Sequence, residues 1–286
     1  MPILMRQIGP SEFPELLSET PHAPKRLFVR GDLPPSDYKL LCVVGSRATS
    51  AYGRRTCASL IAGLAKYKIA IISGLALGID AEAHKAALDV GLPTVAVLPS
   101  SVDDRSIYPT MNRPLAKRIL AQGGALMSEN EGPYTAMIHN FPERNRIMAG
   151  MSHATLIIEA GEKSGTLITA KLALDYNREV LAVPHELGRE GGKGANMLLR
   201  QGATLVRNAE DILEVLGLKP TASTQSPLPL DLSDSEMELL SALSEPILKD
   251  DLIEKTDLSA QEANVGLSSL LIRGLIVERL GKIERS

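Results

Sequence analysis

Apolar runs and amphipathic segments alternate regularly over residues 39–217, and this pattern is compatible with few folds. Runs such as KLLCVV, IAIISG, TVAVLP and ATLIIEA are apolar throughout and have the length of strands. Between them, segments such as YGRRTCASLIAGLAKY and TLITAKLALDYN repeat apolar residues at helical spacing. Apolar strands separated by helices are typical of a parallel sheet that is covered on both faces. We therefore predict an α/β fold with a Rossmann-like, doubly wound, mostly parallel sheet.

The segments on either side of this region have a different character. Residues 1–38 include a proline-rich stretch and predict an irregular arm packed on the core, and residues 218–232 have the Pro, Ser and Thr content of a linker. Residues 233–286 contain three short helix-like segments and then LIVERLGKIER, which predicts a β-hairpin with Gly281 near its turn. Three helices followed by a hairpin are typical of a small winged-helix domain.

Composition argues against several classes of protein. No apolar run approaches the roughly 18 residues of a membrane span, and the first ten residues lack the pattern of a signal peptide. We therefore expect a cytoplasmic protein with no membrane contact. Cys42, Cys57 and the five histidines show no paired or metal-ligand spacing, so we expect no disulfide, metal or cofactor.

The charge is unevenly distributed along the chain. The net charge is only −3, but residues 231–286 hold twelve acidic and six basic residues. The first 230 residues are therefore slightly basic, and any contact with phosphate should fall on them.

Three loops that follow predicted strands carry residues suited to anions. Ligands of open α/β sheets bind beyond the carboxyl ends of the strands, so we expect these loops to meet at one rim. In the first, VVGSRATSAYG, Gly45 allows a tight turn, Ser46 and Ser50 lie beside a helix N-terminus, and Arg47 adds a guanidinium. Backbone N–H groups and the helix dipole favour an anion there. The alternative is a capped turn whose arginine points to water.

The second loop, EAGEKSGTLITAK, stands where a glycine-rich loop enters a helix. Gly165 permits a close backbone approach, Thr166 can cap the helix, and Lys163 and Ser164 add a charge and a hydroxyl. The spacing is not that of a Walker A motif, so this loop predicts phosphate binding without nucleotide hydrolysis. A plain turn is the alternative.

The third loop, HNFPERNRIMAG, combines an aromatic residue with two arginines. Phe141 is able to stack on a base while Arg144, Asn145 and Arg146 hold phosphates. The alternatives are a solvated helix start and a phenylalanine that belongs to the core. Elsewhere, Asp80 and His84 have i, i+4 spacing, but no nucleophile signature accompanies them, so we favour structural hydrogen bonds over an acid–base pair.

In this order, the motifs resemble the DNA-processing protein A (DprA, or Smf) family. The resemblance rests on VVGSRATSAYG, SGLALGIDAEAH, FPERNRIMAG, IIEAGEKSGTLITAKLAL and VLAVPHELGREGGKGANMLLRQGA, and with the lead-in FPELLSETPHAPKRLFVRGDL it covers about residues 11–216. The chain departs from the pattern at His185, where members usually have glycine, and in the longer segment SSVDDRSIYPTMN. These departures bear on the rim of the site and leave the fold unaffected.

The resemblance implies a protein without catalytic activity that binds and protects incoming single-stranded DNA, and loads RecA for homologous recombination in natural transformation. It also implies a homodimer formed through the Rossmann-like domain. By position, the phosphates would lie against Ser46, Arg47, Arg144, Asn145, Lys163, Ser164, Gly165 and Thr166, with Lys171 as a weaker addition. Because only 3% of the residues are aromatic, binding should depend mainly on backbone phosphates.

Two other functions fit the same fold. Phosphoribohydrolases of the Lonely guy type have a catalytic glutamate three residues after their Gly-Thr pair, but this chain has Thr169 at that distance from Thr166. A nucleotide-binding or nucleotide-sensing module remains open as the other reading.

Overall fold

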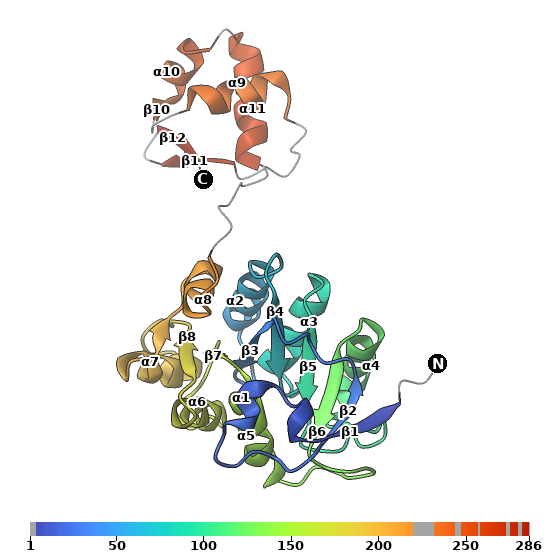
Figure 1. Cartoon of the computed structure of the whole chain (residues 1–286). Helices are drawn as coiled ribbons and strands as arrows, with labels where there is room; N and C mark the ends of the chain where they lie inside the picture. Colours follow the sequence, from blue (N-terminus) through green and yellow to red (C-terminus); the bar gives the residue numbers. More distant parts are fainter. Residues whose placement is uncertain are drawn as a thin grey trace. The chain divides into compact units, whose positions relative to one another are not determined.

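The computed structural model describes residues 4–219, 232–243, 247–256, 258–272, 275–279 and 282–285, and it divides the chain into two compact units at residues 221 and 222. The larger unit is an α/β domain, and the smaller one contains the C-terminal elements (Figure 1). Among the described helices, none is long and apolar enough to cross a membrane. The predicted linker 218–232 lies almost wholly outside the described residues.

The larger unit is built around a nine-stranded sheet with the order β1-β2-β6-β5-β4-β3-β7-β8-β9. The seven strands from β6 to β9 in this order are parallel to one another, and helices join the strands that follow one another in the sequence. This arrangement confirms the doubly wound α/β prediction. These strands are β3 (Lys39–Val44), β4 (Ile69–Ser73), β5 (Thr94–Val97), β6 (Ala125–Ser128), β7 (Ala154–Ile157), β8 (Glu179–Ala182) and β9 (Thr204–Leu205).

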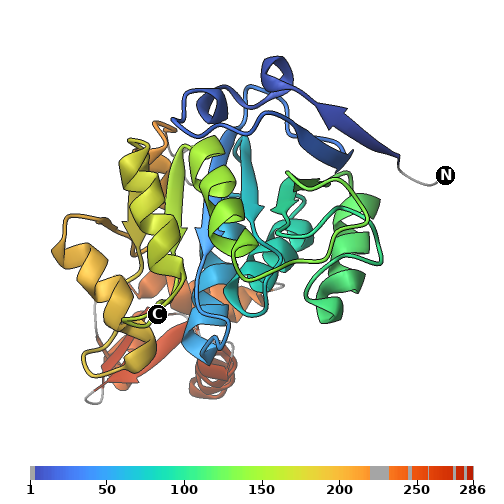
Figure 2. The ribbon, with the colours of Figure 1, turned by 90° about the horizontal axis from the view of Figure 1, so that it is seen from below.

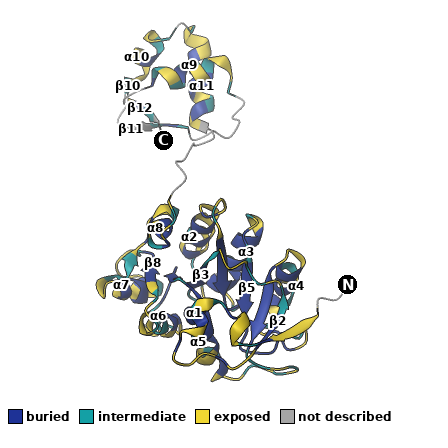
Figure 3. Ribbon diagram, viewed as in Figure 1, coloured by how far each residue is buried: buried dark blue, intermediate teal, exposed yellow. Residues whose placement is uncertain are grey.

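Neighbouring residues of a strand point to opposite faces of the sheet, and in these apolar strands both faces therefore carry apolar side chains. Helices cover both faces and bury these side chains. Cys42 and Val44 of β3 belong to one hydrophobic core, whereas Leu41 and Val43 belong to another. The first core includes residues of α1 (Glu15–Ser18), α5 (Asn140–Met151), α6 (Thr166–Asp175) and α7 (Lys193–Arg200). The opposite face packs against α2 (Ala51–Ala62), α3 (Ile79–Asp89), α4 (Arg113–Ala121) and α8 (Ala209–Val215). Figure 3 shows the sheet buried and the exposed residues on the outer sides of the helices.

The N-terminal arm is not irregular throughout, in contrast to the prediction for residues 1–38. It contributes two strands, β1 (Met5–Ile8) and β2 (Leu27–Gly31), which pair antiparallel with each other. Strand β2 also pairs antiparallel with β6 and thereby extends the sheet. The arm lies along one side of the α/β unit (Figure 2). Between the two strands lie Pro10, Pro14, Pro21, Pro24 and a short 3₁₀ helix (η1, Pro10–Glu12). The proline content of the segment therefore predicted irregular structure although strands flank it.

The smaller unit contains α9 (Asp234–Ala242), β10 (Ile247–Leu248), α10 (Lys249–Glu254), α11 (Ala260–Ile272), β11 (Ile276–Arg279) and β12 (Lys282–Arg285). This is the element order of a winged-helix domain. Strands β11 and β12 pair antiparallel as the sequence predicts, and β10 joins them in a three-stranded sheet. Gly281, expected near the hairpin turn, lies outside the described residues.

Candidate functional site

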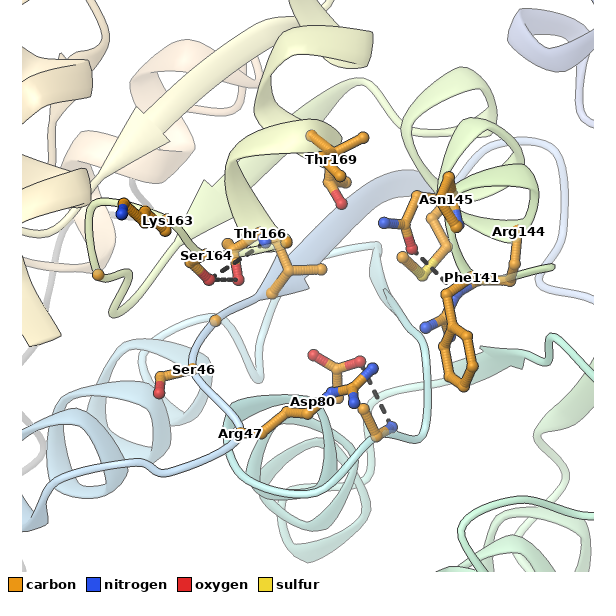
Figure 4. Close-up of a pocket in the computed structure, with 18 of the residues that line it drawn as sticks. Ser46, Arg47, Asp80, Phe141, Arg144, Asn145, Lys163, Ser164, Thr166 and Thr169 are labelled. Atoms are coloured by element: carbon orange, nitrogen blue, oxygen red, sulfur yellow. Dashed lines mark hydrogen bonds between the residues drawn. The ribbon is translucent and has the colours of Figure 1, made fainter. Parts of the chain in front are cut away.

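A pocket of about 640 Å³ lies at the carboxyl ends of β3 and β7, where the winding direction of the sheet reverses. From β3 the chain proceeds toward β6, whereas from β7 it proceeds toward β9, so the loops after these two strands separate in opposite directions. Figure 4 shows side chains from the three predicted loops pointing into this pocket. Of the predicted residues, those that line it are Gly45, Ser46, Arg47, Phe141, Arg144, Asn145, Lys163, Ser164, Gly165 and Thr166.

The loop after β3 is held tightly between two neighbouring segments. The backbone N–H of Ser46 donates to the carbonyl of Glu159 at 2.7 Å, and the Ser46 carbonyl accepts from the N–H of Ile79 at 3.1 Å. A Cβ atom at Gly45 would lie 2.6 Å from Ile79 Cγ1, so glycine is required for this close packing. The exposed Arg47 therefore extends from a rigid base.

The N-terminus of α2, expected as an anion site, is already occupied by a carboxylate of the protein. Glu159 is buried, and its Oε2 accepts hydrogen bonds from the Ser50 N–H at 2.9 Å and from the hydroxyls of Ser50 and Thr49 at 3.2 Å. The Ser50 hydroxyl also accepts from the N–H of Gly53. This corrects the expectation for Ser50, which caps α2 and does not line the pocket.

The N-terminus of α6 faces the pocket with hydroxyls and a lysine. The Ser164 hydroxyl accepts from the N–H of Thr166 at 3.2 Å and donates to the Thr166 hydroxyl at 3.0 Å. Gly165 is exposed, and no atom lies within 4 Å of where its Cβ would stand. Lys163 is also exposed and, among the described residues, forms no ion pair. Its first N–H groups bond to the Ser164 hydroxyl and to backbone carbonyls rather than to a carboxylate, so no acidic side chain of the described residues neutralises the partial positive charge of this helix end.

Arg144 lies in the wall of the pocket as a buried residue that joins two strand ends. Its guanidinium donates to the carbonyls of Gly74 at 2.5 Å and Val97 at 2.7 Å. A Cβ at Gly74 would lie 1.8 Å from Arg144 Nη1, so only glycine leaves room for the guanidinium. Burial lowers the pKa of Arg144, and the charge of the nearby Asp80 carboxylate opposes this shift. Arg144 thus shapes the pocket as well as lining it.

Phe141 and Asn145 complete the side of the pocket formed by α5. The guanidinium carbon of Arg47 lies 5.1 Å from the centre of the half-buried Phe141 ring, a cation–π contact between the first and third loops. The Asn145 side-chain oxygen accepts from Arg144 Nε at 3.1 Å. The ring is therefore part of the pocket wall, in keeping with the predicted convergence of the loops.

Besides Ser50, two predicted residues lie away from the pocket. Arg146 forms an ion pair with Glu129 and donates to the carbonyl of His22, on the side of α5 that faces the N-terminal arm. Residues two positions apart on a helix point in nearly opposite directions, so Arg144 and Arg146 do not share a face. Lys171 is exposed five residues beyond the start of α6, and it also does not line the pocket.

Two acidic residues matter more than the sequence indicated. Asp80 is buried but lines the pocket, and its Oδ2 accepts a hydrogen bond from the N–H of Ala76 at 3.4 Å. Burial raises the pKa of the Asp80 carboxyl, and the positive charge of Arg144 opposes this shift. His84 does not pair with Asp80: its Nδ1 lies 2.7 Å from the Thr94 hydroxyl, and burial lowers its pKa to about 3. Glu159 was not singled out, although a carboxylate that directly follows an apolar strand is a signal for such a role.

Other polar clusters do not compete with this pocket as a site. Within the described part of the chain, no group of three or more His, Cys, Asp or Glu side chains is arranged to hold a metal ion. Cys42 and Cys57 are buried free thiols, and burial raises the pKa of each to about 12. They are therefore inert at neutral pH.

Comparisons with known proteins agree with the resemblance seen in the sequence. Residues 5–217 match the model of the family described as DNA recombination-mediator protein A. The chain is 40% identical to Protein Smf of Escherichia coli K12 over 276 residues, which cover 93% of this chain and 73% of that protein. DNA processing protein A of Streptococcus pneumoniae is a similar solved structure, with a TM-score of 0.69 at 34% identity over 73% of this chain and 74% of the other. DNA processing protein A of Helicobacter pylori, whose structure addresses its single-stranded DNA binding mode, gives a TM-score of 0.66 at 29% identity over 75% and 96% of the two chains.

Proposed function

Because the chain belongs to the DNA recombination-mediator protein A family, we propose that it binds single-stranded DNA with its α/β unit, by holding backbone phosphates in the pocket at the ends of β3 and β7. In this role the protein protects incoming single strands in the cytoplasm and loads RecA onto them during natural transformation. The pocket supports the DNA-binding step. The RecA and transformation steps extend the proposal by family membership.

The observation that carries the proposal is the pair of exposed cations at this pocket. Arg47 and Lys163 come from the loops that follow two adjacent strands, and both line the pocket together with the N-terminal residues of α6. Neither forms an ion pair with a carboxylate in the parts of the chain that are described, whereas Arg146 and several surface arginines do. A phosphate in this position would receive charge from both side chains and hydrogen bonds from the helix end.

The style of binding follows from this geometry. The contacts available are with phosphate, so binding should tolerate different base sequences and weaken steeply with salt. A net charge of −3 provides no general attraction to DNA, so affinity has to come from this local site. We also propose that the protein acts as a homodimer through its α/β unit, which would place two such pockets on one strand and raise the affinity.

An enzymatic function has less support from the same pocket. Thr169, which takes the place of the catalytic glutamate of phosphoribohydrolases, is buried and lines the pocket. The one carboxylate in the described lining is Asp80, which lies beside Arg144 and accepts a backbone hydrogen bond. We therefore propose a binding function without catalysis, and hydrolysis of a nucleoside monophosphate by the parent protein would overturn that part.

The experiment measures the affinity of Arg47→Ala and Lys163→Ala for a roughly 20-nucleotide oligomer over a range of salt concentrations. We expect each variant to bind about tenfold more weakly at moderate salt, with a log–log salt slope that is smaller by about one, because one phosphate contact is lost. Lys171→Ala is the matched control, since Lys171 is exposed nearby but does not line the pocket. If all three variants bind as tightly as the parent, the phosphate site lies elsewhere.

A mononucleotide is the second candidate ligand, because a volume of about 640 Å³ is within the range of small-ligand sites. Competition separates the two functions. A mononucleotide that displaces the oligomer only at far higher concentration supports DNA as the ligand, and one that binds as tightly as the oligomer supports a nucleotide-sensing function.

A further inference from the structure

A second hollow, of about 470 Å³, lies where the N-terminal arm passes α5 (Figure 2), and we call it the arm hollow. Residues of the arm, including Lys25 and Arg26, line it together with Glu129 and Arg146. Lys25 is exposed and, within the described part of the chain, forms no ion pair. Arg26 meets Glu131 at 3.5 Å, with both side chains more than half exposed. The arm hollow therefore carries more positive than negative charge.

The arm presents these two cations from a backbone that is already fixed. Arg146 donates to the carbonyl of His22 at 2.6 Å and thereby ties the arm to α5. Pro24 is buried, and its ring restricts the backbone torsion φ. Arg26 directly precedes β2, and its guanidinium carbon lies 5.3 Å from the centre of the Phe28 ring. A ligand that binds here has little conformational freedom to remove from this segment.

A third hollow, of about 300 Å³, joins the arm hollow to the pocket at the ends of β3 and β7, which we call the phosphate pocket. Arg144 lines the phosphate pocket and this middle hollow, whereas Arg146 and Glu129 line the middle hollow and the arm hollow. The middle hollow is neutral overall, because Glu129 and Glu143 balance the two arginines. The three hollows thus adjoin in a row that has an excess of positive charge at both ends.

We propose that a single strand of DNA held in the phosphate pocket continues through the middle hollow to the arm hollow, where Lys25 and Arg26 bind a second group of backbone phosphates. The inference rests on the proposed function and adds the direction in which the strand leaves the pocket.

A long polyanion fits this row better than a small anion does. A free phosphate at the arm hollow would depend on two exposed cations, and charge pairs that are surrounded by water contribute little. A strand that is already held at the phosphate pocket presents its further phosphates at a high local concentration, so weak contacts raise its affinity. The arm hollow should therefore matter only for strands long enough to reach it.

The test measures the affinity for oligothymidines of roughly 4 to roughly 24 nucleotides at one salt concentration. Lys25→Gln should bind the shortest oligomers as tightly as the parent, and the long ones about fivefold more weakly, because one phosphate contact is lost. Arg47→Ala should bind every length more weakly, since Arg47 lines the phosphate pocket. Lys66→Gln is the matched control, because Lys66 is exposed and lies just before β4, at the amino ends of the parallel strands and away from the pocket.

A second measurement uses the parent protein alone. A single photoreactive 4-thiothymidine is placed at each position of a long oligothymidine in turn, and the cross-linked peptides are identified by mass spectrometry. We expect two groups of positions along the strand. One group should cross-link to the loops of the phosphate pocket, and the other to residues 21–26 of the arm.

Three results would overturn the proposed path. An equal loss of affinity for Lys25→Gln at every length would mean that Lys25 acts through its charge at a distance. No loss at any length would assign the arm hollow to another anionic partner, such as an acidic protein segment. Cross-links confined to the loops of the phosphate pocket would show that the strand does not reach the arm.

The proposed function fails in a different way. If the parent binds no oligomer, or if Arg47→Ala binds every length as tightly as the parent, the phosphate pocket is not the DNA site. Weak binding by Arg47→Ala at all lengths, with no effect of Lys25→Gln, would keep the proposed function and overturn only the path to the arm.

Discussion

Helices α2 and α6 both begin beside the pocket, but their first turns are satisfied in different ways. Helix α2 begins after Ser50, and the buried carboxylate of Glu159 accepts from the Ser50 N–H and from two hydroxyls there. Helix α6 begins after Gly165, and its first N–H groups bond to the Ser164 hydroxyl and to the carbonyls of Ser164 and Gly165, so that among the described residues no hydrogen bond joins its start to a carboxylate. Helix α2 follows β3 and helix α6 follows β7, and these two strands are neighbours in the sheet. The positions of the two helices therefore do not explain why a carboxylate accepts from the start of α2 and not from that of α6.

This difference indicates which helix end is able to bind a ligand. A helix N-terminus carries a partial positive charge, and a carboxylate held there removes most of its attraction for a second anion. Helix α8 is closed in a similar way, by the side chains of Asn208 and Asp211. Of these three helix ends, the one at α6 is left open, and it is the one next to Lys163.

The largest expected effect comes from opening the closed end. Glu159→Ala should lower the free energy of unfolding by about 3 kcal/mol, because it leaves the N–H of the half-buried Ser50 and two hydroxyls without their charged acceptor. Urea unfolding measures this loss. Glu162→Ala, in the same loop but exposed, is the control and should change stability by less than about 0.5 kcal/mol. Equal stability of the two variants would show that Glu159 does not close α2 in solution.

The reverse change closes the open end. A side chain at Gly165 meets no atom within 4 Å of its Cβ, so Gly165→Asp should fold and should place a carboxylate at the start of α6. We expect the oligonucleotide to bind about tenfold more weakly, since the carboxylate repels the phosphate that would bind there. Gly165→Asn has the same size without the charge and should bind within about twofold of the parent. If both variants bind equally, charge at this helix end does not govern affinity.

The smallest effect concerns α8, where the closure depends on pH. Hydrogen bonds from Arg207 lower the pKa of Asp211 from 3.8 to about 2. A carboxyl whose pKa is lowered by folding stabilises the native state above pH 4, and this contribution is lost as the pH falls toward 2. Asp211→Asn should therefore cost about 1 kcal/mol at pH 7, a modest value because Arg207 is largely exposed.

Urea midpoints at pH 7, 5 and 3.5 measure this effect. The difference between Asp211→Asn and the parent should be constant at the two higher values and smaller at pH 3.5. Glu214→Gln, exposed on the same helix, should show no comparable difference. A difference for Asp211→Asn that stays the same at all three values would mean that the ionised carboxylate does not stabilise α8.

Much of the site was predictable because its residues follow strands. Arg47 and Lys163 each come a few residues after an apolar run, and in parallel sheets such positions meet at one edge. Arg146 was not predictable in the same way. Its direction depends on the helical phase of α5, and its partner Glu129 comes from a segment whose path the sequence does not reveal.

The alternation of strands and helices, the loops that carry cations and the family can all be recognised in the amino-acid sequence. Each of these depends on residues that are near one another along the chain. Three features became visible in the folded chain alone: the carboxylate of Glu159 closes α2, Arg144 is buried between Gly74 and Val97, and the arm adds two strands to the sheet. These features join residues far apart in sequence, such as Glu159 and Ser50. They depend on which strands are neighbours, and local patterns do not specify the order of strands in a sheet.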